Sequence, residues 1–327
     1  MSLFPRRALA ALLACAAIAP AAAQTDAAAS YPDRPIHLIV PYPPGASTDT
    51  FGRMIGDKIS QTLGQPVIVE NRGGASGNIG SEFVAKAAPD GYTILLGTDA
   101  THSANYHLFK DFPYDPIKDF APITLAAKNI LVLVANPKLA ANNVQELIDY
   151  AKQNRGKLSF GSSGVGSPHH LAGALFNQKA GTDILHVPYR GGGPAVVDVM
   201  GGQVMLVYSS LISVEQQIKG GKVKALAITQ SEPYPGLPGV PPLSDTIPGF
   251  SMESWLAFFA PAGVPKPIVD KLNAAIVKAL QEPDVQEKLK TAGLVPVGNS
   301  PEAFATQLKK DFDARGELIR SAHIEAE

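Results

Sequence analysis

Residues 36–54 read IHLIVPYPPGASTDTFGRM, and this stretch decides the fold class. Its apolar start at 36–42 predicts a buried strand and residues 50–63 predict a helix, with a turn of proline, glycine and small hydroxyl residues between them. The same design recurs at 160–176, FGSSGVGSPHHLAGALF, and at 186–200, HVPYRGGGPAVVDVM. Strands that are continuous apolar runs and alternate with helices are typical of parallel sheets covered by helices on both faces. We therefore predict an α/β fold.

The three turns share a chemistry that suits an anion. Glycines let backbone N–H groups approach a ligand, and the first turn of a helix has unpaired N–H donors and a partial positive charge. A fourth turn, GTDATHS at 97–103, follows another predicted strand at 91–98. In open α/β sheets ligands lie outside the carboxyl ends of the strands, where these turns are expected. Each turn also has a purely structural interpretation, in which Ser47 is a helix cap and Pro168 or Pro194 a first-turn proline.

Two long apolar segments predict that the chain crosses between two lobes. Residues 123–137, ITLAAKNILVLVANP, are too long for one ordinary strand, and residues 250–263, FSMESWLAFFAPAG, form a return crossing. A mature chain of about 300 residues also exceeds the size at which one hydrophobic core usually keeps growing. We expect lobe one to comprise residues 31–128 plus 251–327 and lobe two residues 129–250. Each lobe should hold a mostly parallel sheet, with a cleft between the lobes.

The N-terminus reads MSLFPRRALAALLACAAIAPAAAQ, with Arg6 and Arg7 ahead of an apolar run and small residues ahead of Gln24. This pattern predicts a cleavable secretory signal peptide at residues 1–23 and a periplasmic location. Two alternatives stay open, a twin-arginine signal and lipidation of Cys15. Cys15 is the only cysteine of the chain, so the mature protein has no thiol for a disulfide or a metal site.

Composition and motifs exclude several classes of function. The 28 basic and 29 acidic residues provide no cationic field for nucleic acid. The chain has no phosphate-binding loop, H-E-x-x-H motif or EF-hand loop, and Gly161-Ser162-Ser163-Gly164 lacks the spacing of a nucleophile elbow. We therefore expect no catalytic residue, no metal and no cofactor.

One alternative belongs to another class of protein, a secreted serine hydrolase. It would use Ser163 or Ser167 with His169 or His170. Such a site needs a third group that orients the histidine, and no aspartate or asparagine is obviously placed for that role.

Eight segments, in this order over the mature chain, resemble the Bug family, the extracytoplasmic solute receptors of tripartite tricarboxylate transporters. They are YPDRPIHLIVPYPPGASTD, GQPVIVENRGGASGNIGSEFVAKAAPDGYTILLGT, PYDPIKDFAPIT, SSGVGSPHHLAGALF, HVPYRGGGPAVVDVMGGQV, GKVKALAIT, FFAPAGVPKPIVDKLNAAI and EKLKTAGLVPVG. The resemblance implies a type II periplasmic-binding-protein fold that closes on a small carboxylate and delivers it to membrane permease subunits. We expect a monomer that does no covalent chemistry. A periplasmic sensor that docks on a signalling protein is the alternative that would use the same closed lobes.

The resemblance also implies which residues line the cleft. Residues 43–49 and 189–194 would supply main-chain donors to the carboxylate, and the turns near 98–102 and 162–169 would set selectivity through side chains. The expected ligand-binding residues are Tyr42, Pro43, Gly45, Ala46, Ser47, Thr48, Asp49, Thr98, Ala100, Thr101, His102, Ser162, Ser163, Gly166, Ser167, His169, Tyr189, Gly191, Gly192, Ser209 and Ser210.

The chain departs from the family's pattern at two places. Ala46 and Ser47 stand where the family usually carries more glycine, which restricts the loop or adds a hydroxyl donor. Ser209 and Ser210 stand where an aspartate is frequent, so no counter-charge would meet an ammonium group there. The second departure predicts an aliphatic or aromatic carboxylate or dicarboxylate without an amino group.

Overall fold

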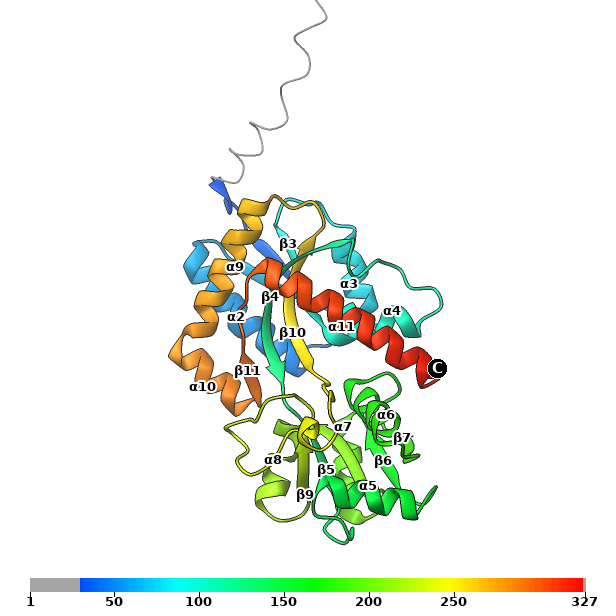
Figure 1. Ribbon diagram of the computed structural model, residues 1–327. Helices are drawn as coiled ribbons and strands as arrows, with labels where there is room; N and C mark the ends of the chain where they lie inside the picture. The colour runs from blue at the N-terminus through cyan, green and yellow to red at the C-terminus, as the bar shows by residue number, and fades with distance from the viewer. Residues whose placement is uncertain (1–29, 326–327) are drawn as a thin grey trace, which may run out of the picture.

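The computed structural model describes residues 30–325, and the signal peptide expected at 1–23 lies outside them. The described chain forms two α/β bodies, drawn one above the other in Figure 1. We use lobe one for the upper body, built on a six-stranded sheet, and lobe two for the lower body, built on a five-stranded sheet. The predicted α/β class is confirmed.

The sheet of lobe one has the strand order β11-β4-β10-β3-β1-β2. Its strands are β1 (Ile36–Val40), β2 (Val67–Asn71), β3 (Thr93–Thr98), β4 (Phe120–Asn129), β10 (Ser254–Pro261) and β11 (Leu294–Pro296). The sheet of lobe two has the order β7-β6-β8-β5-β9. Its strands are β5 (Leu131–Ala135), β6 (Ser159–Ser162), β7 (Leu185–Pro188), β8 (Leu206–Ser210) and β9 (Lys224–Ile228).

The helices cover both faces of the two sheets (Figure 1). In lobe one they are α2 (Ser47–Leu63), η1 (Ala75–Gly77), α3 (Asn78–Ala85), η2 (Ala100–Ala104), α4 (Asn105–Leu108), α9 (Lys266–Gln281), α10 (Pro283–Thr291) and α11 (Pro301–Ser321). In lobe two they are α5 (Val144–Gln153), α6 (Pro168–Ala180), α7 (Gly192–Gly201), α8 (Leu211–Lys219) and η3 (Leu243–Asp245). None of the helices within 30–325 is both long and apolar enough to span a bilayer.

Strand direction shows where the sequence prediction was incomplete. The strand–helix units pair in parallel as expected, β1 with β2 and β3, and β6 with β7 and β8. The antiparallel pairs of residues 30–325 all include β4, β5 or β10, the strands of the two crossing segments. The sheets are therefore mixed rather than mostly parallel, because a strand that enters from the other lobe need not follow the direction of the units that it joins.

Alternate residues of the central strands pack on opposite faces of each sheet, as the pleat requires. In β1, Ile36, Leu38 and Val40 belong to the cluster under α2 and α9, whereas Ile39 packs on the other side with Trp255. In β5, residues 132 and 134 face one cluster and residues 133 and 135 face another. Each sheet is thus buried on both faces, which explains the continuous apolar runs.

Two glycines let α2 lie close to the sheet. A Cβ on Gly52 would lie 2.9 Å from Val40 Cγ2, and one on Gly56 would touch Val67 and Val69 at 3.4 Å. Phe51, on the same face of the helix, is buried. This close contact fixes the direction of α2, so that its N-terminus projects beyond the carboxyl end of β1.

The crossings lie side by side. β4 ends at Asn129 and β5 begins at Leu131, so the single residue Ile130 joins the two sheets. Its carbonyl accepts a hydrogen bond from Leu211 N at 2.8 Å. On the return path Met252 N donates to Thr229 O at 3.0 Å, immediately before β10. The lobe boundaries given from the sequence stay a prediction.

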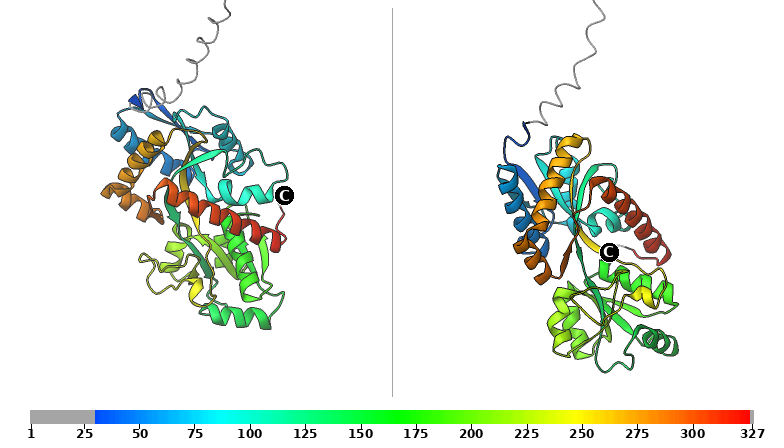
Figure 2. Two further views of the ribbon diagram at one scale, coloured as in Figure 1. Left: turned by 45° about the horizontal axis from the view of Figure 1, so that its top comes forward. Right: turned by 60° about the vertical axis from the view of Figure 1, so that its left-hand side comes forward.

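Helix α11 contacts both lobes. Phe304 and Leu308, near its start, pack with Trp255 in the core of lobe one. Leu318 and Ile319, near its end, pack in the main core of lobe two. Figure 2 shows the helix running obliquely across the molecule between the two bodies. The C-terminal segment is therefore a third connection between the lobes, which the sequence did not indicate.

Candidate functional site

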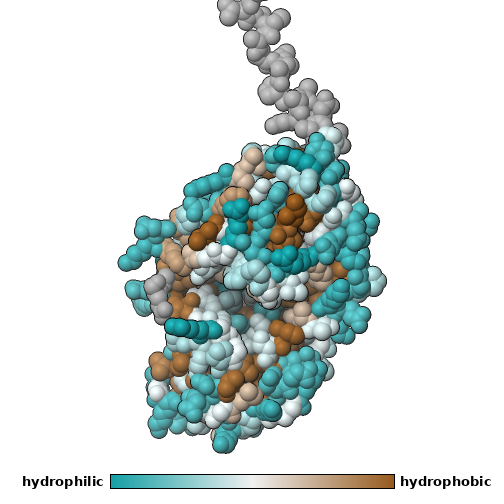
Figure 3. Space-filling model, turned by 180° about the vertical axis from the view of Figure 1, so that it is seen from behind, coloured by the Kyte–Doolittle hydropathy of each residue, from teal (hydrophilic) through white to brown (hydrophobic). Residues whose placement is uncertain are grey.

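A cavity of about 1530 Å³ lies where the two lobes meet. Figure 3, which views the molecule from behind, shows this face hollowed between the upper and lower bodies. Of the expected ligand-binding residues, nine line the cavity: Tyr42, Ala46, Ser47, Thr48, Thr98, Ala100, Ser163, Gly191 and Ser210. Eight of the nine come from the four predicted turns and Ser210 ends β8, so the fold brings the turns of both lobes to one cavity.

The first turn ends at the start of α2. Ala46 is the cap residue in an extended conformation, and no side chain caps the helix. The first backbone N–H groups of α2 have no partner within the helix and open towards the cavity beside Ser47 and Thr48. Tyr42 and Thr98 bind each other across two strands at 2.9 Å through their hydroxyl groups.

Asp49 is turned away from the cavity. Its carboxylate accepts hydrogen bonds from Gly45 N and from Asn71 Nδ2, both at 2.9 Å, and forms an ion pair with Arg53 at 2.9 Å. Burial alone would raise the pKa of Asp49, but the hydrogen bonds from Gly45, Arg53 and Asn71 together lower it. Asp49 therefore holds the shape of the turn. Asp49, Pro43 and Gly45 were expected to line the cavity, but none of them does.

The turn after β3 also divides into lining and structural residues. Thr98 and Ala100 line the cavity, whereas Thr101 and His102 are completely buried. Thr101 Oγ1 accepts from Thr98 N at 3.0 Å and closes the turn. The His102 ring stacks on Phe259 with centroids 3.8 Å apart, because the one-turn π-helical segment η2 directs it into the core. His102 and Thr101 are thus core residues, contrary to the sequence prediction.

In the turn after β6, Ser163 lines the cavity and its neighbours support it. Ser162 Oγ binds His186 Nε2 at 2.6 Å inside lobe two. Ser167 is the N-cap of α6, since its Oγ accepts from His170 N at 3.2 Å. Gly166 has a φ of 73° and packs against Leu108. Ser162, Gly166 and Ser167 were predicted to line the cavity, but they do not. Their contacts stabilise the turn instead.

Ser163 and His169 form the contact that a serine hydrolase would need, but without the rest of the site. Ser163 Oγ lies 2.7 Å from His169 Nδ1, and His169 Nε2 lies 3.5 Å from Ser210 Oγ. Ser210 in turn accepts from Asn129 Nδ2 at 2.9 Å. A hydroxyl group, not a carboxylate, faces the second nitrogen, and burial lowers the pKa of His169 to about 4. A histidine this weakly basic is a poor general base at neutral pH.

The turn after β7 places the start of α7 at the cavity. Gly191 has a φ of 101°, which only glycine adopts readily, and it precedes the first helical residue, Gly192. Tyr189 points aside, its hydroxyl donating to Asp198 at 2.8 Å. Ser209 is fully buried, its Oγ has no partner among the described residues, and it lies 3.7 Å from where a Cβ on Gly192 would sit. Tyr189, Gly192 and Ser209 therefore lie beside the cavity rather than in its wall.

Several lining residues were missed by the sequence prediction. Asp99, Asn129, Ser254 and Trp255 belong to the crossings and to the end of β3, and all line the cavity. Asp99 lies within the predicted turn at 97–103 but was not named among the expected ligand-binding residues. The other three became visible only when β4 and β10 were placed next to β3. The cavity also continues along α2 towards α10.

The described residues contain no group of three or more His, Cys, Asp or Glu side chains that could hold a metal ion. The histidines near the cavity are engaged elsewhere: His170 stacks on His186 with centroids 3.7 Å apart. Near the four turns the polar lining is therefore made of hydroxyl groups, amides, the two helix starts and the carboxyl group of Asp99. Charged side chains of α2 and α10 line the part of the cavity that extends between these two helices.

Residues 51–324 match the model of the tripartite tricarboxylate transporter family receptor, TctC. The protein BugT of Bordetella pertussis is 39% identical over 286 residues, covering 87% of this chain and 86% of that protein.

Two solved structures with bound molecules are also similar. Rpa4515 of R. palustris with adipate is 32% identical with a TM-score of 0.77, covering 90% of this chain and 99% of that one. MatC of Rhodopseudomonas palustris with bound malate is 34% identical with a TM-score of 0.73, covering 88% of this chain and 100% of that one. The resemblance and the fold inferred from the sequence are both confirmed.

Proposed function

The chain belongs to the tripartite tricarboxylate transporter receptor family, whose members are periplasmic substrate-binding proteins and not enzymes, and on this premise we propose that it captures a small carboxylate between its lobes. The observation that carries the proposal is the position of two helix starts. α2 from lobe one and α7 from lobe two begin at the same cavity, beside Ser47 and Gly191. Helix N-termini attract anions through unpaired N–H groups and a partial positive charge.

The hydroxyl groups of the wall suit a carboxylate as well. Thr98, Ser163 and Ser210 offer donors from the carboxyl ends of three different strands, β3, β6 and β8. Each lobe alone would leave half of the donors facing water, so the full set forms only when the lobes close on the ligand. Two of the similar structures hold dicarboxylates, adipate and malate.

We further propose that the ligand lacks an amino group. This proposal rests on Ser209 and Ser210, which stand where an aspartate is frequent in the family. Ser210 Oγ accepts a hydrogen bond from the side-chain amide of Asn129. No carboxylate lies at this place to meet an ammonium. The ligand class is therefore an aliphatic or aromatic carboxylate or dicarboxylate.

The cellular setting follows from the family. We propose that residues 1–23 are removed as a signal peptide, that the mature protein is a periplasmic monomer, and that it delivers its ligand to the permease subunits of a tripartite tricarboxylate transporter. Sedimentation of the mature protein and co-purification with the permease would test these points.

Thermal unfolding of the mature protein with small carboxylates tests the function directly. A ligand at 100 times its dissociation constant adds about 2.7 kcal/mol of stability, which raises the midpoint clearly. We expect adipate or malate to raise it, and the matched amino acids 2-aminoadipate and aspartate to raise it less. The ligand class is wrong if the amino acids bind more tightly in calorimetry, and the function is wrong if no carboxylate of a broad panel binds.

A further inference from the structure

Asp99 places a carboxylate in the wall of a cavity that otherwise suits an anion. The residue is 3% exposed, follows β3 directly and lines the cavity. One oxygen, Oδ1, accepts from Ser254 Oγ at 3.1 Å and from Trp255 N at 3.4 Å. An ionised and unpaired carboxylate at this place would repel an anionic ligand and attract an ammonium.

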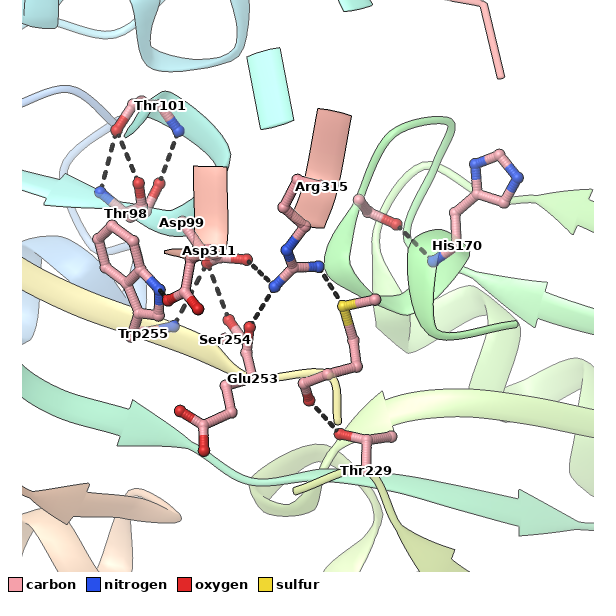
Figure 4. Close-up of polar contacts among 12 residues, drawn as sticks. Thr98, Asp99, Thr101, His170, Thr229, Glu253, Ser254, Trp255, Asp311 and Arg315 are labelled. Atoms are coloured by element: carbon pink, nitrogen blue, oxygen red, sulfur yellow. Dashed lines mark hydrogen bonds and ion pairs between the residues drawn. The ribbon is translucent and has the colours of Figure 1, made fainter. Parts of the chain in front are cut away.

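Arg315 of α11 supplies the missing counter-charge. Its side chain is buried, and a guanidinium nitrogen lies 3.6 Å from Asp99 Oδ2. The same guanidinium contacts the Met252 sulfur and donates to Glu253 O, both in the return crossing. Figure 4 shows Arg315 pointing from its helix into the space between the crossing and Asp99. Arg315 is not among the cavity-lining residues of the described chain, so it can act on the ligand only through Asp99.

The other titratable neighbours of Asp99 do not provide this charge. Asp311, one turn before Arg315, is an acid whose Oδ2 accepts from Trp255 Nε1 at 3.0 Å. Burial raises the pKa of Asp311, while Arg315 lowers it. Burial also raises the pKa of Tyr42 to about 12, so this phenol is neutral. Burial likewise raises the pKa of Asp99, and Arg315 is the main cause that opposes it.

Asp49 shows a similar acid–arginine pairing in the first turn, although it does not line the cavity. It too is buried, and Arg53 binds it from behind at 2.9 Å. Arg53, however, is half exposed, and Asp49 also accepts hydrogen bonds from two other groups. Arg315, in contrast, is buried and is the one cation in contact with Asp99 among the described residues. Asp99 therefore depends on a single arginine.

We propose that Arg315 is a specificity-determining residue of the cleft, which neutralises Asp99 from behind so that the wall accepts a carboxylate and offers no free acid to a ligand ammonium. This inference rests on the proposed function. It assigns to the C-terminal helix a part in ligand choice, although the helix does not reach the ligand.

Calorimetric titration with adipate, or with malate if the wild type prefers it, tests the proposal in the mature protein. R315M should weaken dicarboxylate binding roughly tenfold at pH 8.5, because the variant leaves the Asp99 carboxyl group without a counter-charge. The loss should be smaller at pH 6.5, because an unpaired buried carboxylate takes up a proton more readily. R315M should also narrow the preference for adipate over 2-aminoadipate. The double variant R315M/D99N should recover most of the affinity and lose the pH dependence.

Two further variants keep the test decisive. D99N alone leaves Arg315 without its acidic partner, so it should bind adipate more tightly than the wild type and should widen the preference for adipate over 2-aminoadipate. R320M removes the same charge from an exposed position of α11 and should change neither affinity. If Arg315 had a purely structural role, the loss of dicarboxylate affinity in R315M would not vary with pH and would not be reversed by D99N. That result, or unchanged binding in R315M, overturns the inference about Arg315 and leaves the proposed function standing. A wild type that binds no carboxylate of the broad panel overturns the proposed function with it.

Discussion

At the scale of single residues, burial keeps four histidines uncharged at neutral pH. It lowers the pKa of His169 and His170 to about 4, and that of His102 and His186 to about 3. The unfolded chain binds protons at these residues near pH 6.5, whereas the folded chain does not. Their contribution to stability is therefore complete above pH 6.5 and is lost as the pH falls towards 4.

His102 allows this linkage to be tested at one residue. Its ring is fully buried, stacks on Phe259, and has no partner at Nε2 among the described residues. Phe has a similar shape and cannot titrate. In urea, the free energy of unfolding of H102F should fall less steeply than that of the wild type as the pH is lowered from 6.5 to 4.5. The two slopes should differ by up to about 1.4 kcal/mol per pH unit.

The matched control is H323F, which changes an exposed histidine near the C-terminus. This variant should keep the wild-type dependence of unfolding free energy on pH. An H102F curve parallel to that of the wild type would show that the folded protein protonates His102 after all.

The residues show where sequence reasoning succeeded and where it failed. Ser47, Ser163 and Gly191 were placed correctly at one cavity because each follows a strand–turn–helix pattern that fixes its position at a sheet edge. His102 was misplaced because the direction of its side chain depends on a π-helical turn and on Phe259, 157 positions further along the chain. Arg315 carried no signal at all, since its contacts arise only from the path of α11.

At the scale of elements, α6 shows how a hydroxyl in the cleft region serves folding. Ser167 Oγ accepts from His170 N at 3.2 Å and donates to Gly164 O at 2.7 Å. This pairing is that of an N-cap, which satisfies a free donor at the start of the helix. Ser167, one of the two serines that the hydrolase alternative would use, is therefore committed to backbone groups.

The variant S167A should lower the free energy of unfolding by about 1 kcal/mol, as loss of a cap does. Neither the wild type nor S167A should hydrolyse nitrophenyl esters above the rate of the buffer. Chemical denaturation and an ester assay measure the two effects. S300A removes the cap of α11, whose Oγ accepts from Ala303 N at 3.2 Å, and should cause a similar loss of stability. Ester turnover that S167A abolishes would contradict the cap-only role.

Regular helices were the most predictable elements. The helix predicted at 50–63 occurs in α2, which begins three residues earlier, at Ser47. The sequence did not predict helix α8 (Leu211–Lys219). Small and apolar residues run from β8 into its first turn, and no proline, glycine or acidic residue marks where the strand ends and the helix begins. The direction of β4, β5 and β10 could not be derived either, since it depends on contacts between distant segments.

At the scale of the whole molecule, α11 opposes free movement of the lobes. Its first half packs in lobe one and its last turns pack in lobe two, where Leu318 is 4% exposed. Gln178 of α6 also donates to Ser321 Oγ at 2.9 Å. Closure of the cleft must therefore either carry the end of α11 along or shift it against lobe two, and unfolding of one lobe removes packing from the other.

The variant L318A should uncouple the lobes. Removing this buried side chain should cost about 2–5 kcal/mol, and part of the loss falls on the contact that joins the two cores. We expect the wild type to unfold in urea in one transition, seen alike by far-UV circular dichroism and by fluorescence of Trp255, the only tryptophan. In L318A the two signals should separate, because Trp255 reports lobe one while dichroism reports both lobes.

L147A provides the matched control for this test. Leu147 belongs to the same core cluster as Leu318 but lies on α5, within lobe two, and is also fully buried. Its truncation should lower stability to a similar extent and leave the two transitions together, because α11 still transmits the unfolding of one lobe to the other. Coincident transitions in both variants would mean that contacts other than those of Leu318 couple the lobes, among them β4, β10 and the packing of Leu108 against Gly166. Separation in L318A and not in L147A would place the coupling in the C-terminal helix, the element whose Arg315 lies against Asp99 of the cavity wall.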